Sequence, residues 1–337
     1  MSAADAAVHR ASAFDLVRDA AGRRPLLVLG AGLAAAAGTL ALTEGPTELA
    51  QASINGVVAG NYYALGAVGL TLIFGVLRLV NFAHGEFLTL GAYLMLLFAS
   101  FDLPLLAAAA LAVAATAVFS LGLEVGVWRP VRRRGAGELQ LLLFALGLAF
   151  FMRNAIAFIA TSEDRQTGAD VTTSVSVGAL RVGRTELIVT SIGIAVIVLV
   201  AIALRSSSLG RQARALADSI DLAETTGVNT DKVVLVTWGV SGALAGLAGI
   251  VYALPAGAAN PNLGFSLILS IFAAVVVGGI GNAYGALAGG LLIGLVQEWA
   301  TLVIEPSMKV AVGFGMLILV LLLRPQGLFG PARSADR

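Results

Sequence analysis

The chain has 337 residues, of which 58% are hydrophobic and 12% charged, and its formal net charge is +1. Charged residues make up about a quarter of an ordinary soluble domain, so this composition excludes a soluble globular protein. The chain contains no cysteine, which excludes disulfides, thiolate metal ligands and a cysteine nucleophile.

Apolar residues are grouped in blocks close to the roughly 20-residue length of a membrane-spanning helix. In chain order, the blocks cover residues 25–43, 50–77, 87–100, 105–127, 139–161, 186–204, 233–254, 264–280, 284–303 and 309–323. This pattern predicts an all-α polytopic membrane protein with about ten spans. The blocks at 87–100 and 264–280 are short, and whether they cross the membrane fully stays open.

The distribution of Lys and Arg predicts the orientation. If the N-terminus is cytoplasmic and the spans alternate, most of the 21 basic residues fall on the cytoplasmic side, as the positive-inside rule requires. This interpretation places an N-terminal tail, residues 1–24, and a C-terminal tail, residues 324–337, in the cytoplasm. A single transmembrane domain, residues 25–323, lies between them. Because no convincing cleavage site follows the first apolar run, we predict a retained first helix.

Two loops are long enough to carry structure of their own. In the external loop, residues 162–185, β-branched and small residues alternate around Gly178, which predicts a short hairpin. This loop is either a contact surface for an external partner or a simple connector. The longest cytoplasmic loop, residues 205–232, contains a stretch of helical propensity at 211–226 that Gly227 is placed to end.

The predicted helix at 211–226 is amphipathic. Its apolar face holds Ala215, Ile220, Leu222 and Ala223. Its polar face holds Asp218, Asp221 and Glu224. Such a helix would suit a docking surface for a cytoplasmic protein, or it would rest on lipid headgroups. The acidic residues would be repelled by anionic headgroups, which makes binding to the membrane surface the less favourable alternative.

A polar break separates the blocks at 50–77 and 87–100 and contains Asn81, His84 and Glu86. Ionisable groups so close to membrane-length apolar runs are costly if they face lipid, so they would line a cavity or pack inside the protein. The alternative is a short cytoplasmic turn in which His84 and Glu86 are solvated. Both interpretations stay open on the sequence.

Further polar residues lie within the apolar blocks. Asn55 and Tyr62 are seven residues apart, and Asn61 lies near the same helical stripe, so one polar face would line a path through the protein. Hydrogen bonding between helices is the alternative role for the asparagines. Arg153 is expected to pair with Glu124 or Glu298 inside the bundle, or to extend outward.

Glycine is abundant, with 40 residues in the chain. The segment GGIGNAYG, residues 278–285, is a glycine-rich break that either exposes backbone groups for binding or forms a tight turn. Other glycines recur at helical spacing and are interpreted as helix-packing positions. These are Gly242, Gly246, Gly249, Gly285, Gly289 and Gly290.

Two segments carry a family resemblance that extends from about Ile54 to about Phe329. NGVVAGNYYALGAVGLTLIFGVLRLVNFAHGEF, residues 55–87, resembles the signature region of permease subunits of branched-chain amino-acid ABC importers. Urea and short-amide importer permeases are close relatives. ARALADSIDLAETTGVNTDKV, residues 213–233, is similar to the coupling loop of these permeases. It departs from the Glu-Ala-Ala-x-x-x-Gly motif by Asp221 for Glu and Leu222 for Ala.

The resemblance implies a multi-pass permease subunit in the bacterial cytoplasmic (inner) membrane that imports branched-chain or other neutral amino acids by alternating access. Its implied partners are a second homologous permease, two cytoplasmic ATP-binding subunits, an external solute-binding protein and membrane lipid, with no nucleic acid. ATP and Mg²⁺ would bind to the ATPases, because this chain has no phosphate-binding loop of its own. We therefore expect no cofactor, no metal and no enzymatic activity in this chain.

The site residues that these arguments indicate fall into two groups. The expected substrate path comprises Asn55, Asn61, Tyr62, Asn81, His84, Glu86, Gly278, Gly279 and Gly281. The expected ATPase-coupling surface comprises Ala215, Asp218, Asp221, Leu222, Ala223, Glu224 and Gly227.

Three other functions compete with an amino-acid importer. One is import of urea or a short amide. Another is a proton-coupled secondary carrier in which His84 and Glu86 relay protons without any ATPase. The third, an intramembrane enzyme, is disfavoured because no nucleophile–base pair is evident in the sequence.

Overall fold

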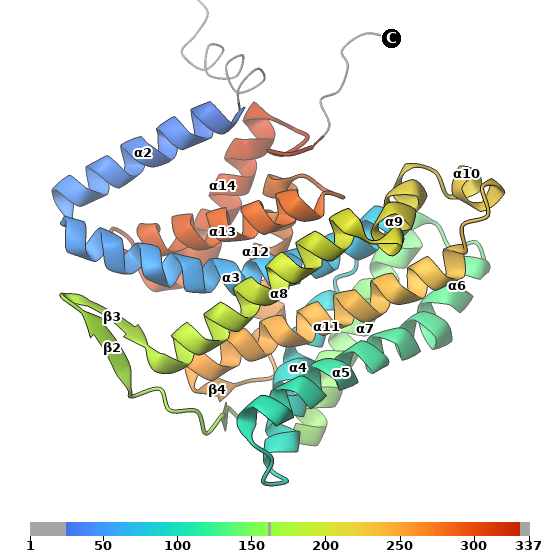
Figure 1. The fold of residues 1–337 in the computed structure, drawn as a ribbon, viewed down its shortest axis with the longest axis horizontal. Coiled ribbons are helices and arrows are strands. Elements are labelled where there is room, and N and C mark those ends of the chain that lie inside the picture. The colour runs from blue at the N-terminus through green and yellow to red at the C-terminus, as the bar shows by residue number, and fades with distance from the viewer. Residues whose placement is uncertain (1–24, 161–162, 331–337) are drawn as a thin grey trace, which may run out of the picture.

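A computed structural model describes residues 25–160 and 163–330 of the chain (Figure 1). The predicted tail at 1–24, and residues 331–337 of the predicted C-terminal tail, lie outside the described residues. The first helices are α2 (Pro25–Thr43), α3 (Pro46–Leu77), α4 (His84–Ala99), α5 (Leu105–Leu123), the π-helical turn η1 (Glu124–Trp128), α6 (Arg129–Arg133) and α7 (Glu138–Ala160). The later helices are α8 (Arg184–Ser206), α9 (Ser208–Asp218), α10 (Ile220–Thr225), α11 (Thr230–Ala256), α12 (Leu263–Gly278), α13 (Ala283–Ala300), the 3₁₀ turn η2 (Pro306–Met308) and α14 (Lys309–Leu323).

Every apolar block predicted from the sequence corresponds to one of these helices, and the all-α membrane architecture is confirmed. Among the described residues, six helical segments are long and apolar enough to cross a membrane. They are Pro46–Leu77, Leu105–Arg133, Glu138–Ala160, Arg184–Ser206, Thr230–Ala256 and Pro306–Leu323. Shorter apolar helices lie at Leu27–Thr43, His84–Ala99 and Leu263–Gly278.

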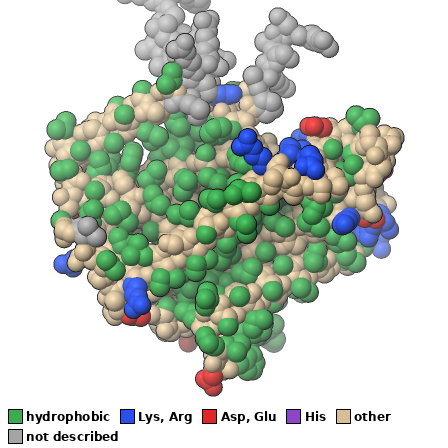
Figure 2. All heavy atoms as spheres, viewed as in Figure 1, with side chains coloured by type: hydrophobic (Ala, Val, Ile, Leu, Met, Phe, Trp, Pro, Cys, Tyr) green, Lys and Arg blue, Asp and Glu red, His purple; other side chains and the backbone are tan. Residues whose placement is uncertain are grey.

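The helices differ in how deeply they are buried. The apolar stretches of α3 and α11 are 72% and 61% buried, whereas those of α5, α7, α8 and α14 are at most 22% buried. Helices α3 and α11 therefore form the centre of the bundle, and the other four present apolar faces outward. Figure 2 shows hydrophobic side chains over the middle of one face and charged side chains near its margins. This is the surface expected of a protein whose solvent is lipid.

Two pairs of short antiparallel strands accompany the helices. β2 (Ser174–Val177) pairs with β3 (Leu180–Gly183), and Gly178 in the turn between them has φ +65°. The hairpin predicted in the external loop is therefore confirmed. The second pair joins β1 (Arg165–Gln166) to β4 (Ala258–Ala259). In Figure 1 the β2–β3 hairpin lies at one end of the long helices, and α6, α9 and α10 lie at the other.

Glycine allows the central helices to approach one another closely. An alanine Cβ at Gly60 of α3 would lie 2.7 Å from the Cα of Leu291 in α13, and one at Gly56 would lie 2.8 Å from the Cα of Leu295. The six glycines predicted as packing positions also lie against neighbouring helices, where an added Cβ would collide, and that prediction is confirmed. Lipid tails are as apolar as leucine, so such close packing stabilises the bundle where the hydrophobic effect between helices is weak.

Replacing Gly60 by alanine should destabilise the protein by about 1–3 kcal/mol, because α3 and α13 would have to separate. Gly122→Ala is the matched control, since an added Cβ on this α5 glycine meets no atom within 4 Å. It should leave stability unchanged or raise it slightly, as alanine favours helix. Thermal unfolding of the purified protein in detergent measures both. Equal midpoints for the two variants would contradict the packing argument.

Candidate functional site

The break between α3 and α4 is shorter than the sequence suggests. Helix α3 ends at Leu77, where Arg78 adopts a left-handed conformation with φ +52° and donates its backbone N–H to Phe74 at 2.8 Å. Helix α4 then begins at His84, so His84 and Glu86 belong to its first turn. Both are buried, with 0% and 1% exposure. The interpretation as a solvated turn is therefore wrong for these two side chains.

The buried groups of this break are only partly satisfied by hydrogen bonds. Nε2 of His84 lies 3.0 Å from the carbonyl oxygen of Gly66 and donates to it, since a carbonyl only accepts. Within the described residues, Nδ1 of His84 and both amide atoms of Asn81 have no hydrogen-bond partner. Each such buried group costs about 1–3 kcal/mol. Polar groups retained at that cost are candidates for a function in the membrane.

The carboxylate of Glu86 is joined to α12 through a threonine. The hydroxyl of Thr89 donates to Glu86 at 3.4 Å and accepts the backbone N–H of Gly264 at 2.9 Å. Gly264 lies in the first turn of α12, where backbone N–H groups have no partner within the helix. Thr89 therefore supplies a hydrogen-bond acceptor for a backbone N–H group in the first turn of α12, and it holds α4 beside that helix.

The predicted polar face of α3 divides between two environments. Asn55 and Tyr62 line a pocket of about 280 Å³ together with Tyr252 of α11, Glu298 of α13 and Lys309 of α14. Asn55 itself is exposed, although it lies within an apolar block of the sequence. We call this hollow the polar pocket.

Asn61 is fully buried and points away from the polar pocket, toward α8. Its Nδ2 donates to the carbonyl of Thr190 at 3.3 Å, and its amide fills the space that a side chain at Gly193 would occupy. Asn61 therefore makes the interhelical hydrogen bond that the sequence left as an alternative.

The glycine-rich break before α13 holds the segment that follows α14. The backbone N–H of Phe329 donates to Gly278 at 3.1 Å, and Nδ2 of Asn282 donates to the carbonyl of Phe329 at 3.0 Å. Gly279 and Gly281 have φ +108° and +84°, which other residues rarely adopt. The break lies at the opposite end of α13 from the polar pocket, and this 18-residue helix is about 27 Å long.

The helix predicted at 211–226 is wrong as a single element. Ser219 is extended, with φ −160° and ψ 116°, and separates α9 from α10. Its side chain accepts the backbone N–H of Leu222 at 3.3 Å and so caps α10. Gly227 has φ +83° just after α10, in agreement with the predicted end. Serine favours capping positions over helix interiors because its side chain competes for backbone hydrogen bonds. The helical propensity of the flanking residues concealed this interruption of the helix.

The α9–α10 segment is attached to the end of α3 and to α11. Leu216 and Ala223 are buried with Val76 of α3 and Val233 of α11 in a small apolar cluster. In addition, Nη2 of Arg78 donates to the carbonyl of Ala217 at 3.1 Å. Other side chains of α10 point outward: Asp221, Leu222 and Glu224 are exposed, and Leu222 is 66% exposed.

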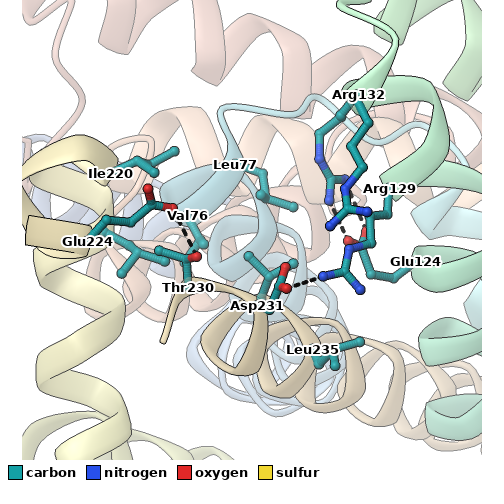
Figure 3. A pocket seen from close by; sticks show the side chains of 13 residues that line it. Val76, Leu77, Glu124, Arg129, Arg132, Ile220, Glu224, Thr230, Asp231 and Leu235 are labelled. Atoms are coloured by element: carbon teal, nitrogen blue, oxygen red, sulfur yellow. Dashed lines mark hydrogen bonds and ion pairs between the residues drawn. The ribbon is translucent and has the colours of Figure 1, made fainter. Parts of the chain in front are cut away.

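A second pocket, of about 260 Å³, lies between the α9–α10 segment and α6 (Figure 3). Arg129 forms an ion pair with Asp231 at the start of α11, and Arg132 forms a two-armed ion pair with the buried Glu124. The first pair connects α6 to the start of α11, beside the α9–α10 segment, whereas the second lies within the continuous helical segment from η1 to α6. The charged groups drawn in Figure 3 are thus largely paired with one another.

The expected pairing of Arg153 is wrong. Glu124 pairs with Arg132, and Glu298 pairs with Lys309 at 2.6 Å. The guanidinium of Arg153 instead lies over two aromatic rings, 5.1 Å from Phe150 and 4.6 Å from Phe265. Cation–π contacts of this kind suit arginine at an apolar boundary.

The bundle has apolar helices of membrane length, buried polar groups at helix breaks and pockets toward both of its ends. These features define a multi-pass membrane transport protein. Residues 52–321 match the family described as branched-chain amino acid transport system / permease component. The chain belongs to this family. No solved structure matches it.

Curated relatives agree with this assignment. The high-affinity branched-chain amino acid transport system permease protein BraD of Pseudomonas aeruginosa is 32% identical over 83% of this chain and 95% of its own length. LivH of Escherichia coli, a permease of the same description, is 31% identical over the same shares. The ribose import permease protein RbsC of Haemophilus influenzae matches a shorter stretch, with 32% identity over 36% of this chain and 39% of its own length. The chain is therefore a transport subunit and not an enzyme.

Thr89→Val should destabilise the protein by about 1–3 kcal/mol, because it leaves the buried N–H of Gly264 without its acceptor. Thr116→Val is the matched control. Thr116 is equally buried, but its hydroxyl only returns to Ala112 of its own helix, whose carbonyl keeps its helical bond. Thermal unfolding in detergent compares the two variants. A loss as large for Thr116→Val as for Thr89→Val would show that the link to α12 is not important.

Proposed function

We propose that this chain is one of two permease subunits of an ATP-driven importer that takes branched-chain or other neutral amino acids from an external solute-binding protein. Two cytoplasmic ATPases would bind ATP and Mg²⁺ and supply the energy. This chain would contribute the membrane path, and it would hold no cofactor or metal of its own. Its membrane would be the bacterial cytoplasmic membrane.

The α9–α10 segment carries the proposal. A short capped helix with outward-facing Asp221, Leu222 and Glu224 is suited to insertion into a cleft on another protein. The segment is attached to α3 through Arg78 and the apolar cluster at Val76. A movement imposed on α10 by an ATPase would therefore reach the central helix directly. Ala215, Asp218, Ala223 and Gly227 would shape this surface from behind or beside it.

The substrate path would run along α3. Asn55 and Tyr62 at the polar pocket would meet the substrate first, and the buried Asn81, His84 and Glu86 would become accessible when the helices rearrange during alternating access. The unpartnered amide of Asn81 supports this proposal, because a passing polar substrate would supply its missing hydrogen bonds. Asn61 and the glycines at 278, 279 and 281 would act by fixing α8 and the end of α12 along this path.

We also propose about ten spans with both termini in the cytoplasm. This topology places the β2–β3 hairpin outside and the α9–α10 segment inside, at opposite ends of the long helices (Figure 1). The basic α6, with Arg129, Arg132 and Arg133, then lies on the cytoplasmic side, as the positive-inside rule favours.

Because the chain has no cysteine, single cysteines can report this topology without a background signal. In intact cells, a membrane-impermeant maleimide should label Ser176→Cys on the hairpin and leave Thr225→Cys unlabelled until the membrane is opened. Both residues are exposed, so access to the thiol is matched. Labelling of Thr225→Cys in intact cells would overturn the proposed orientation.

The ATPase contact is tested by co-purification. Asp221→Arg should reduce recovery of the ATPases with the permease about tenfold or more, because it reverses an exposed charge in the first turn of the docking helix. Glu138→Arg, at the exposed start of α7, reverses a carboxylate on the same predicted side and should have no effect. Gly227→Val tests the left-handed end of the segment and should also weaken recovery.

If no ATPase is recovered even with the wild-type chain, the importer proposal fails. Uptake in vesicles that lack the ATPases but carry a proton gradient would then favour a secondary carrier built on His84 and Glu86. If ATP-driven uptake is observed for urea or a short amide and not for leucine, the importer stands and the proposed substrate is wrong.

A further inference from the structure

We infer that the polar pocket is a binding site for the two charged ends of a zwitterionic α-amino acid, with Lys309 facing the carboxylate and Glu298 and Glu186 facing the ammonium group. The inference rests on the proposed function and deepens it, since it selects amino acids over urea and short amides. It concerns a pocket to which five helices contribute: α3, α8, α11, α13 and α14.

The pocket combines charge and apolar surface. Its charged lining residues are Glu186, Glu298 and Lys309. Its apolar and aromatic lining residues include Val58, Val251 and Tyr252. Its volume of about 280 Å³ is sufficient for one free amino acid and small for a peptide. An amino acid with an aliphatic side chain needs a cationic partner, an anionic partner and an apolar surface, and the lining of the pocket offers all three.

The charged groups are arranged so that a ligand can exchange with them. Lys309 and Glu298 form an ion pair at 2.6 Å, and their side chains are 33% and 13% exposed. When a zwitterion enters between them, its carboxylate replaces Glu298 as the partner of Lys309, and its ammonium group replaces Lys309 as the partner of Glu298. Neither side chain is then left unpaired in a poorly solvated place. Neither urea nor a short amide carries a charge with which to make this exchange.

Glu186 supplies a second carboxylate. One of its oxygens, Oε2, accepts the backbone N–H of Gly183 at 3.0 Å, which holds the side chain at the first turn of α8. Its other oxygen is available to an ammonium group. Because an ammonium group carries three N–H donors, two carboxylates and the amide oxygen of Asn55 are suitable partners for it.

The apolar wall of the pocket is built of aromatic and branched residues. The rings of Tyr62 and Tyr252 meet edge to face with centroids 5.2 Å apart, and Val251 lies next to Tyr252 on α11. An aliphatic side chain would pack on this surface. Since one methylene group in an apolar pocket changes selection by about 10–200-fold, the wall would distinguish leucine from alanine.

The location agrees with delivery from outside. Gln51, one helical turn before Asn55, exchanges two hydrogen bonds of 2.9 Å with the backbone of Arg181 in the β2–β3 hairpin. The same Gln51 side chain donates to Asn55 at 3.1 Å. Nearby, the hydroxyl and N–H groups of Thr173 and Thr172 hold the pKa of Asp170 well below its usual range. The hairpin is therefore an ordered structure tied to the mouth of the pocket.

Two other hollows formed by the described residues do not offer this combination. The groove of about 560 Å³ between α5, α8 and α11 is apolar apart from Thr185, and a zwitterion would lose its hydration there without compensation. The pocket beside α6 holds charged groups, but it lies at the end of the bundle proposed to face the ATPases.

The test uses the complete transporter in vesicles: this chain, its partner permease, the ATPases and the solute-binding protein. The probe is a leucine analogue with a photoreactive diazirine in its side chain, and mass spectrometry locates the cross-links. We expect labelling at Tyr62 and at residues 251–256. Excess leucine should prevent it, whereas the matching keto acid, the matching amine without a carboxylate, and urea should not at equal concentration.

Lys309→Met and the double variant Lys309→Met with Glu298→Gln should each reduce pocket labelling about tenfold or more, as a charge-assisted contact is lost. The double variant leaves neither charge unpaired, so it separates binding from instability. Lys309→Arg should retain labelling. Glu305→Gln is the matched control, because Glu305 lies between Glu298 and Lys309 in the chain but outside the pocket.

Unchanged labelling in the double variant, or cross-links only outside the pocket, would overturn the inference while ATP-driven leucine uptake by the wild type keeps the importer proposal intact. Competition by the keto acid or amine as strong as by leucine would also overturn it. Pocket labelling with the expected competition, but without ATP-dependent uptake, would support the binding site and reject the importer.

Discussion

Where α3 crosses α13, the two backbones approach so closely that a single added methyl group at Gly60 would lie 2.7 Å from the Cα of Leu291. In water the hydrophobic effect would hold such helices together, but in lipid the apolar surroundings are equally favourable to each helix alone. Close packing must then supply the stabilisation, and it requires glycine. The central position of α3, and through it the placement of every polar group along that helix, depends on this constraint.

Helix α3 connects the regions that matter for transport. It is 32 residues long, which corresponds to about 48 Å and exceeds the roughly 30 Å hydrocarbon core of a bilayer. Asn55 and Tyr62 line the polar pocket toward its start, Gly66 accepts a hydrogen bond from His84 at its middle, and Arg78 contacts α9 just past its end. A displacement of this helix therefore reaches the buried break, which begins where α3 ends.

The break itself shows how polar groups are kept inside an apolar bundle. His84 and Glu86 lie in the first turn of α4, and Thr89 connects them to the start of α12 through Gly264. Asn81 and His84 hold three of the eight buried side-chain atoms that have no hydrogen-bond partner within the described residues. A fold selected for stability alone would have apolar residues here. The cost is understandable in a protein whose path must accommodate a polar solute.

The amino-acid sequence was sufficient to predict the positions of the apolar helices, the hairpin around Gly178 and the glycine packing positions. These follow from block length, alternation and helical spacing, which are local properties of the chain. The family could also be predicted, because its characteristic residues lie in continuous segments. The end of α10 at Gly227 was predictable for the same reason.

Which side chains contact one another depends on the packing of the helices and could not be predicted from the sequence. Spacing placed Asn55 and Asn61 on one stripe, yet packing against Gly193 turns Asn61 toward α8 and leaves Asn55 at the pocket. Ser219 divides a stretch that propensity favours as one helix, and Arg153 stacks on aromatic rings while its expected carboxylate partners pair elsewhere. The charges of the polar pocket come from α8 and, much later in the chain, from the successive helices α13 and α14. Contacts of that kind depend on how helices cross, which no local pattern of residues encodes.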